Sequence, residues 1–317
     1  MPILKNSPHT ANSTLEVIGK TPVVRLQNIV PEGSADIVVK LEYFNPTGSY
    51  KDRMALSMIE EAEKRGDLKP GMTVVEWTGG STGSSLAFVC AVKGYPFKVV
   101  SSDAYANEKL QTMVAFGADL HVEPSDGGKI TPDLFDRMFA KAEELTKATN
   151  GYWTNQLNNG DSLIGYRGIG RELLAQLDQP LDAFCGMVGT GGMIMGVSAE
   201  LRLANPDTMI VALEPATSPA ISKGYNGPHT VDGTGIGFVP PLVDKSQFND
   251  ARGIDEQEGR AMARRLATEE GIFGGTSTGL NVVGALQLAR ELGPGKTVAT
   301  VACDFGLKYL AGDLYSI

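Results

Sequence analysis

Short apolar strands alternate with helical segments along most of the 317-residue chain. Residues 73–77 and 97–100 are apolar and rich in β-branched side chains, and each is followed by a segment with apolar residues at helical spacing. The same alternation resumes at residues 183–188 and 209–213. Strands that alternate with helices over short loops form parallel sheets covered by helices. The sequence therefore predicts an α/β fold with mostly parallel sheets.

Length and charge limit the class of protein. A chain of 317 residues is long for one hydrophobic core, so we expect two domains, with a crossing at the Asn150-Gly151 turn. The net charge of −9 argues against a nucleic-acid partner, which would require a basic face. No run is long and apolar enough to span a membrane, and the first five residues do not open a signal peptide. We therefore expect a cytoplasmic protein with no membrane partner.

The cysteines of this chain are few and far apart, whereas its glycines are numerous and clustered. Cys90, Cys185 and Cys303 lie far apart with no histidine at ligand spacing, so we expect buried thiols rather than disulfides or a metal site. The chain has 38 glycines, about 12% of its residues where roughly 7% is usual. They are clustered, which indicates places where the backbone approaches something closely.

One stretch, Asn-Pro-Thr-Gly-Ser-Tyr-Lys-Asp-Arg at residues 45–53, delivers Lys51 to the start of a predicted helix with Ser49 as its expected N-cap. The partial positive charge at a helix N-terminus disfavours an ammonium and lowers the pKa of a lysine there. A lysine with a lowered pKa is a nucleophile that forms Schiff bases with carbonyl compounds. The alternative is a solvated surface lysine, which is the commoner situation for this residue type.

Three glycine clusters follow predicted strands or open predicted helices, at residues 78–83, 189–193 and 274–279. Free backbone N–H groups at a helix start, with no side chains in the way, form an anion site. The second cluster suits a single phosphate, because it matches neither the dinucleotide-binding pattern GxGxxG nor the P-loop pattern. Each cluster taken alone is as readily a tight turn without a ligand. Three in one α/β chain favour a ligand in the crevice beyond the strand ends.

A nucleophilic lysine, a phosphate site and a hydroxyl-bearing loop together describe a pocket for pyridoxal 5′-phosphate. Over almost its whole length the chain resembles the cysteine synthase (O-acetylserine sulfhydrylase) and cystathionine β-synthase family of fold-type-II enzymes. The resemblance is carried by Ile-Gly-Lys-Thr-Pro at 18–22, the lysine motif at 45–53, the loops at 78–83 and 189–193, Gly-Ile-Gly-Phe-Val-Pro at 235–240, and Ser277.

The resemblance implies an α/β fold of two three-layer αβα domains with twisted, mostly parallel sheets, similar to the tryptophan synthase β-subunit. Residues 45–150 are expected to form a smaller, mobile domain that carries the substrate-carboxylate loop. Residues 1–44 and 151–317 are expected to form the larger domain, which binds the cofactor phosphate. The family also implies a homodimer.

The resemblance assigns a role to each candidate site residue. Lys51 is expected to hold the cofactor as a Schiff base and then to act as general base at the substrate Cα. The expected cofactor-binding residues are Lys51, Ser81, Gly189, Thr190, Gly191, Gly192, Met193 and Ser277, the last on the pyridine nitrogen. The expected substrate-binding residues, at positions that bind the substrate carboxylate, are Thr78, Gly79, Thr82 and Gln156. No metal site is expected.

Two positions depart from the family pattern. Ser81 stands where the family usually has an asparagine that contacts a ring oxygen of the cofactor, and a serine is too short to reach that oxygen except through water. Met193 ends the phosphate loop where the family usually has threonine or serine. This change removes one hydroxyl donor and leaves the backbone amides to hold the phosphate.

The predicted reaction is β-replacement on an activated L-serine such as O-acetylserine, through an aminoacrylate intermediate, with a small nucleophile such as sulfide. A neutral serine on the pyridine nitrogen makes a weaker electron sink, which favours loss of a β-substituent over racemisation or transamination. The alternatives are a β-eliminating lyase, of the cysteine desulfhydrase or serine/threonine dehydratase type, and a non-catalytic regulatory homologue. The intact lysine motif argues against the last.

Overall fold

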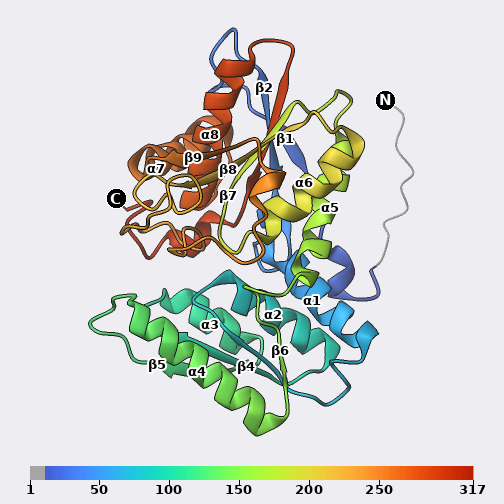
Figure 1. Ribbon diagram of the computed structural model, residues 1–317, viewed down its shortest axis with the longest axis vertical. Helices are drawn as coiled ribbons and strands as arrows, with labels where there is room; N and C mark the ends of the chain where they lie inside the picture. Colours follow the sequence, from blue (N-terminus) through green and yellow to red (C-terminus); the bar gives the residue numbers. More distant parts are fainter. Residues whose placement is uncertain (1–10, 317) are drawn as a thin grey trace.

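The computed structural model describes residues 11–316 and places them around two β-sheets, one above the other in Figure 1. The larger sheet has six strands in the order β1-β2-β10-β7-β8-β9. Their bounds are β1 Val23–Arg25, β2 Asp36–Leu41, β10 Thr297–Ala302, β7 Ala183–Met187, β8 Met209–Pro215 and β9 Asp250–Ile254. β1 is antiparallel to β2, and the other neighbouring strands are parallel.

The smaller sheet has four parallel strands in the order β5-β4-β3-β6. Their bounds are β5 Asp119–Glu123, β4 Phe97–Ser102, β3 Val74–Trp77 and β6 Tyr152–Trp153. The eight α-helices of the described residues are α1 Lys51–Arg65, α2 Ser81–Lys93, α3 Asn107–Ala115, α4 Pro132–Thr149, α5 Asp161–Gln176, α6 Gly192–Ala204, α7 Glu256–Arg265 and α8 Thr276–Leu292.

Both sheets are buried on two faces, which explains the continuous apolar runs of their strands. Successive side chains of a strand point to opposite faces. Along β2, Ile37 and Val39 belong to the buried cluster that contains α7 and α8, whereas Val38 belongs to the cluster that contains α5 and α6. In the smaller sheet, Val75 faces α4 and Val74 faces α2. The prediction of two three-layer αβα units with mostly parallel sheets is confirmed.

The two units share a packed junction. α1 packs against α2 on one side and α5 on the other, and one cluster of buried hydrophobic residues continues from α2 through α1 into α5 and α6. The smaller sheet continues to Trp153 through β6, three residues past the expected boundary at 150. The division into 45–150 against 1–44 with 151–317 stays a prediction, and its residues 1–10 lie outside the described part of the chain.

Three local features differ from expectation. The two-residue β6 and the polar β9 carry no sequence pattern that identifies a strand, because their pairing to β3 and β8 is what makes them strands. The N-cap of α1 is Tyr50 and not Ser49, so that prediction is wrong by one residue. The Ser49 hydroxyl still accepts a hydrogen bond from the Lys51 amide at 3.3 Å.

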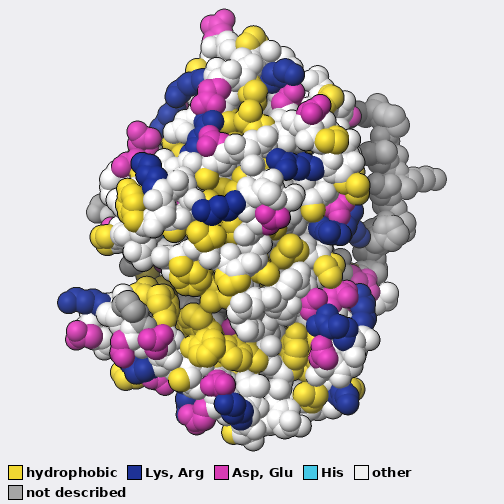
Figure 2. Space-filling view, viewed as in Figure 1, with side chains coloured by type: hydrophobic (Ala, Val, Ile, Leu, Met, Phe, Trp, Pro, Cys, Tyr) yellow, Lys and Arg dark blue, Asp and Glu magenta, His cyan; other side chains and the backbone are white. Residues whose placement is uncertain are grey.

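The surface carries acidic and basic side chains scattered over both units, whereas hydrophobic side chains gather near their junction on the face shown in Figure 2. Among residues 11–316, no helix is long and apolar enough to cross a membrane.

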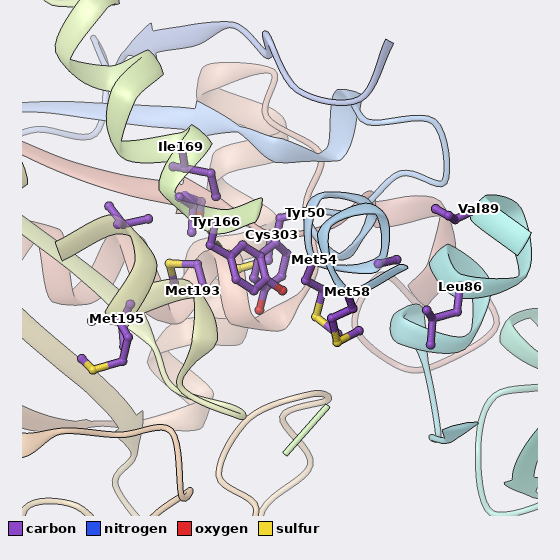
Figure 3. Close-up of a cluster of buried hydrophobic side chains, with 14 of the residues drawn as sticks. Tyr50, Met54, Met58, Leu86, Val89, Tyr166, Ile169, Met193, Met195 and Cys303 are labelled. Atoms are coloured by element: carbon purple, nitrogen blue, oxygen red, sulfur yellow. Dashed lines mark hydrogen bonds between the residues drawn. The ribbon is translucent and has the colours of Figure 1, made fainter. Parts of the chain in front are cut away.

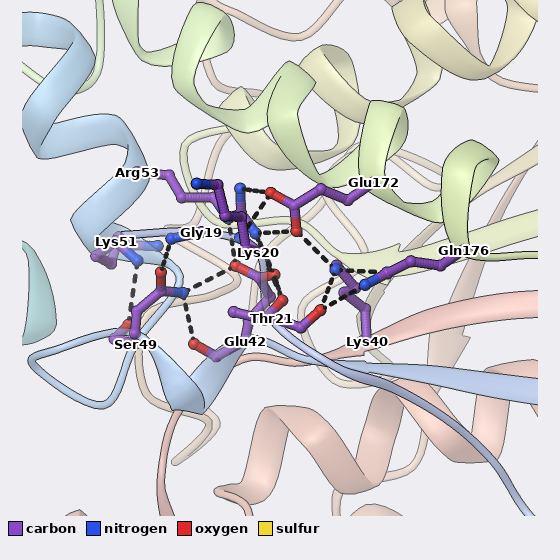
Figure 4. Close-up of polar contacts among 11 residues, drawn as sticks. Gly19, Lys20, Thr21, Lys40, Glu42, Ser49, Lys51, Arg53, Glu172 and Gln176 are labelled. Carbon is purple, nitrogen blue, oxygen red and sulfur yellow. Dashed lines mark hydrogen bonds and ion pairs between the residues drawn. The ribbon is translucent and has the colours of Figure 1, made fainter. Parts of the chain in front are cut away.

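A buried ionic network fixes the start of α1 to the larger sheet (Figure 4). The Arg53 guanidinium donates to Glu42, at 2.6 Å from Nε, and to Glu172, at 2.7 Å from Nη1. Glu42 is fully buried, and the Arg53 side chain is only 5% exposed. Lys40 adds a third contact, to Glu172 at 2.6 Å. Burial raises the pKa of Glu172, but the hydrogen bonds and charge of Arg53 outweigh it and lower that pKa to about 2.

We predict that Arg53→Met lowers the free energy of unfolding by about 3–5 kcal/mol, because it leaves the Glu42 carboxylate buried without its partner. Urea unfolding followed by circular dichroism measures the loss. Arg65→Met is the matched control in the same helix: Arg65 pairs with Asp67 and Asp161 but is 45% exposed, so its loss costs less than about 1 kcal/mol. Equal losses for the two variants would contradict the structural role given to Arg53.

Candidate active site

Lys51 is the first residue of α1 and lies where that helix meets the carboxyl end of β10. The Tyr50 amide donates to the Cys303 carbonyl at 3.0 Å, which ties the lysine motif to the residue after β10. The Lys51 Nζ lies 4.0 Å from the centroid of the Tyr50 ring, and it forms no hydrogen bond or ion pair with residues 11–316. Burial lowers the pKa of Lys51 to about 8. The structure thus presents an amine that is readily deprotonated.

The expected phosphate loop faces this amine. One cavity is lined by Lys51 together with Gly189, Thr190, Gly191 and Met193. α6 begins at Gly192, and no side chain caps its N-terminus. The first N–H groups of a helix have no partners within it, and the helix dipole adds a partial positive charge there. The loop therefore offers an anion site on the wall of the lysine cavity.

Glycine is required in this loop by both conformation and space. Gly191 has a φ of +89°, and a Cβ on it would lie 2.5 Å from Val243 Cγ2. A Cβ on Gly189 would lie 2.2 Å from the Gly233 carbonyl oxygen. The backbone can approach a ligand here only because these side chains are absent.

Tyr50 and Tyr166 line the same cavity as Lys51, and Figure 3 shows their rings side by side. The rings of Tyr50 and Tyr166 lie 5.3 Å apart, centroid to centroid. The Tyr166 hydroxyl is buried and has no hydrogen-bond partner among residues 11–316, so it is an available donor on the cavity wall. The Met193 side chain packs into the hydrophobic core. Only its backbone N–H remains for the expected role in phosphate binding.

Ser277 lies in the first turn of α8 and is buried. Its hydroxyl lies near the Cys303 thiol, whose pKa burial raises to about 12. Lys51 lies close enough to Cys303 to act on that pKa as well. Cys303 is therefore a neighbour of both Lys51 and Ser277, the two residues that the resemblance places on the cofactor.

The expected substrate residues also converge. Thr82, in the first turn of α2, donates from Oγ1 to the Gln156 side-chain oxygen at 2.8 Å, across 74 residues of sequence. Buried Glu76 accepts from the Gln156 amide at 3.0 Å and holds this segment against β3. Thr78 is buried at the end of β3, and the Tyr105 ring occupies the space that a side chain at Gly79 would take.

Ser81 has an unexpected neighbour. The Lys308 ammonium donates to the Ser81 hydroxyl at 3.2 Å. Lys308 belongs to a short helical turn, Gly306–Tyr309, that follows β10. This contact joins the loop of the smaller unit to the C-terminal segment of the larger one.

Sequence reasoning missed three residues of the site: Tyr166, Cys303 and Lys308. Cys303 and Lys308 follow the carboxyl end of β10, whose sequence Thr-Val-Ala-Thr-Val-Ala is rich in β-branched residues, and this end of a parallel strand is where open α/β sheets bind ligands. That signal was available in the sequence. Tyr166 lies in the middle of α5 and carries no such signal.

The fold and the site define a class of protein: an enzyme that holds a phosphate-bearing carbonyl cofactor between a lysine and a helix N-terminus. The comparisons agree. The family model for pyridoxal-phosphate dependent enzymes matches residues 14–304. A cysteine synthase of Staphylococcus aureus is 42% identical over 304 residues, which are 95% of this chain and 96% of that protein. The chain belongs to the family of pyridoxal-phosphate-dependent enzymes, and pyridoxal phosphate is its cofactor.

Solved structures agree with this assignment. A cysteine synthase from Entamoeba histolytica matches with a TM-score of 0.92 and 31% identity, covering 100% of this chain and 94% of that one. A hydrogen sulfide-producing enzyme from Fusobacterium nucleatum matches with a TM-score of 0.87 and 38% identity, covering 95% of this chain and 98% of that one. Fold type II of the pyridoxal phosphate enzymes, which the sequence predicted, is confirmed.

The residues present fit this cofactor. The uncapped N-terminus of α6 and the glycines before it suit the phosphate, and the Lys51 amine has no competing acidic partner within residues 11–316. The unpartnered Tyr166 hydroxyl adds a donor on the same wall.

We predict that Gly191→Ala weakens pyridoxal phosphate binding at least about tenfold, because the new methyl group forces the phosphate loop away from Val243. Equilibrium dialysis of the apoenzyme with the cofactor measures the dissociation constant. Gly271→Ala is the control: Gly271 also has a positive φ, +69°, but a Cβ there would meet nothing within 4 Å. The prediction fails if both variants bind the cofactor equally well.

Proposed function

We propose that this protein catalyses β-replacement on an activated L-serine of the O-acetylserine type, with a small nucleophile such as sulfide. One observation supports the proposal most directly: the Lys51 amine, with its pKa lowered to about 8, lines the same cavity as the glycine loop at residues 189–193, where α6 begins. The cysteine synthases among the relatives and solved structures support the same reaction class. Overall, one cysteine and one acetate form from one O-acetylserine and one hydrosulfide.

Pyridoxal phosphate, when bound, supplies an electron sink for negative charge at the substrate Cα. Lys51 holds the cofactor and, once the substrate has displaced it, accepts the Cα proton at Nζ. A pKa of about 8 suits this role, because near neutral pH the amine exchanges protons in both directions. The amides of Gly189, Thr190, Gly191, Gly192 and Met193 bind the phosphate in this proposal, and Ser81 contacts the cofactor ring, as the family resemblance implies.

The uncharged side chains of Ser277 and Cys303 support β-replacement over transamination. Ser277 faces the pyridine nitrogen in this proposal, and its neighbour Cys303 stays protonated because its pKa is about 12. Neither group carries a charge that would keep the nitrogen protonated, so negative charge at Cα is short-lived and the β-substituent leaves.

The polar groups of Thr78, Gly79, Thr82 and Gln156 bind the substrate carboxylate in this proposal. Thr82 and Gln156 hydrogen-bond each other on the smaller unit, where Glu76 of β3 holds the Gln156 amide, and in this proposal a carboxylate bound there draws residues 45–150 toward the rest of the chain. Such closure excludes water from the reacting atoms. We further propose that the protein acts in the cytoplasm as a homodimer, as the family resemblance implies.

A β-eliminating lyase is the second candidate, because a hydrogen sulfide-producing enzyme is among the solved structures with 38% identity. Elimination requires the same lysine, the same phosphate-binding loop before α6 and the same neutral residue at the pyridine nitrogen. The two reactions differ in whether water or a thiol reacts with the bound product of elimination. A purely regulatory protein would not require the deprotonatable Lys51 amine.

The two reactions are separated by two incubations of the holoenzyme. With O-acetylserine and sulfide, we expect cysteine and acetate in equal amounts; with cysteine alone, we expect little pyruvate. Cysteine is measured by a thiol-specific amino-acid assay and pyruvate by lactate dehydrogenase coupling. Rapid pyruvate release from cysteine with negligible cysteine synthesis would reject the synthase assignment in favour of the lyase.

We predict that the Lys51 amine of the apoenzyme titrates with a midpoint of about 8, because burial disfavours the ammonium. Below that pH the nitrogen is protonated and unreactive, and above it the free amine is the nucleophile. Reductive methylation with ¹³C-formaldehyde followed by NMR measures the midpoint, and the Lys51→Arg variant identifies the signal. The same variant should lose the visible absorption of the bound cofactor. A midpoint near 10.5, the ordinary lysine value, would contradict the lowered pKa.

A further inference from the structure

The Tyr166 hydroxyl is a buried polar group to which the proposed reaction gives no role. The residue is 1% exposed, and its hydroxyl has no hydrogen-bond partner among residues 11–316. Burying a hydroxyl without a partner is unfavourable, because the group has given up its hydrogen bonds to water. A buried and unpaired polar group on the wall of a ligand cavity indicates that the ligand supplies the partner.

The close packing of α5 on α6 sets the direction of the Tyr166 side chain. A Cβ on Gly196, in the second turn of α6, would lie 2.8 Å from Tyr166 Cβ. A Cβ on Gly192, the first residue of α6, would lie 3.2 Å from Cε2 of the tyrosine ring. Residues four apart lie on the same face of a helix. The side chain therefore runs along this face of α6 toward the helix N-terminus, and the hydroxyl is at its leading end.

The wall of the lysine cavity agrees with this direction. Tyr166 lines the cavity together with Lys51 and with three residues of the phosphate loop, Gly189, Thr190 and Gly191. The start of α6 favours an anion at this place, because its first N–H groups have no partners within the helix. Burial raises the pKa of Tyr166 well above its ordinary value. The hydroxyl therefore keeps its proton near neutral pH and is a hydrogen-bond donor.

Other hydroxyls near the start of α6 are few. Ser162 also lies against Gly192, since a Cβ there would be 3.0 Å from the serine Oγ. The proton of this serine is already used, because its hydroxyl donates to the carbonyl oxygen three residues earlier at 2.8 Å. The phosphate loop itself has one hydroxyl, on Thr190, because it ends in Met193. Tyr166 can supply a further donor from outside the loop.

We propose that the Tyr166 hydroxyl donates a hydrogen bond to the phosphate of the cofactor, so that α5 adds a side chain to the backbone amides at the start of α6. A hydrogen bond to a charged acceptor is stronger than one between neutral groups. The inference concerns cofactor binding, which β-replacement and β-elimination both require. It therefore does not depend on which of the two reactions the protein catalyses.

The test compares two ligands that differ at the phosphate, pyridoxal 5′-phosphate and pyridoxal. The full chain is first freed of cofactor with hydroxylamine, and equilibrium dialysis then gives the dissociation constant of each ligand. The measured quantity is the factor by which the phosphate tightens binding. We expect Tyr166→Phe to lower this factor at least about tenfold, the usual effect of losing one hydrogen bond to a charged group. The dissociation constant of pyridoxal should stay unchanged.

Tyr43→Phe is the matched control. It removes the same hydroxyl from another buried tyrosine, whose ring packs against Phe44 and Phe305 and does not line the lysine cavity. Its factor should equal that of the wild type. Equal weakening of both ligands in Tyr166→Phe would overturn the proposal, because a residue that supports the cavity or contacts the cofactor ring does not distinguish them. An unchanged factor would overturn it as well.

Urea unfolding of the cofactor-free chain separates this role from a structural one. Removing a buried hydroxyl that has no partner in the protein does not destabilise the fold. Tyr166→Phe should therefore leave the unfolding midpoint unchanged or raise it, and a lowered midpoint would overturn the proposal by showing an internal partner. None of these measurements involves turnover, so a failure of the proposed β-replacement would leave their results unaffected.

Discussion

The buried contact between Arg53 and the carboxylates of Glu42 and Glu172 fixes the rest of the site. Residues two apart on a helix point in nearly opposite directions. When Arg53 is anchored in the larger unit, Lys51 must therefore face the other side of α1, which is the side of the cavity. Burying this network removes several charges from water, which is unfavourable. Because each of these charges has a partner of opposite sign, the start of α1 can nevertheless be buried between the two sheets. The position of the amine follows from the position of the guanidinium.

The electrostatic environment of Lys51 differs from that of Arg53 although the two residues are two positions apart. Arg53 has two acidic partners, whereas Lys51 has an aromatic ring below its nitrogen and no acid in contact within residues 11–316. Burial without a partner favours the neutral amine. The start of α6, across the cavity, has no side-chain cap, and its first N–H groups lack hydrogen-bond partners within the helix. These N–H groups therefore favour binding of an anion. The same cavity thus holds an amine that favours the neutral form, Lys51, and a helix N-terminus that favours a bound anion. An aldehyde that carries a phosphate can use both groups, because the amine reacts with the aldehyde and the helix N-terminus binds the phosphate.

The sequence predicted most of the fold because its strongest signals are local. The strands predicted at 73–77, 97–100, 183–188 and 209–213 begin within one residue of β3, β4, β7 and β8. The helices α2 and α6 begin inside the glycine loops at 78–83 and 189–193. What could not be predicted depends on strand order. β10 is last in the chain but lies between β2 and β7, and this order brings Cys303 and Lys308 beside Lys51. Periodicity does not encode the order of strands, so Cys303 appeared to be only a buried thiol. The Tyr166 hydroxyl was missed because a tyrosine in a helix ordinarily indicates core packing.

The parts of the site that hold the cofactor and the parts that choose the reaction are built differently. In the proposed site, backbone N–H groups bind the phosphate, and the loop needs glycine at 189 and 191 because a Cβ there would clash. The Met193 side chain packs into the core, so methionine at this position leaves the backbone of the loop unchanged. Around the reacting centre the contacts are made by side chains such as Ser81 and Lys308, which can differ without altering the backbone amides at the start of α6. Relatives can therefore keep the cofactor at 30–40% identity and differ in what they make or release, as the cysteine synthase and the hydrogen sulfide-producing enzyme do in name. In this chain one such contact joins Lys308, in the turn after β10, to the Ser81 hydroxyl at the start of α2.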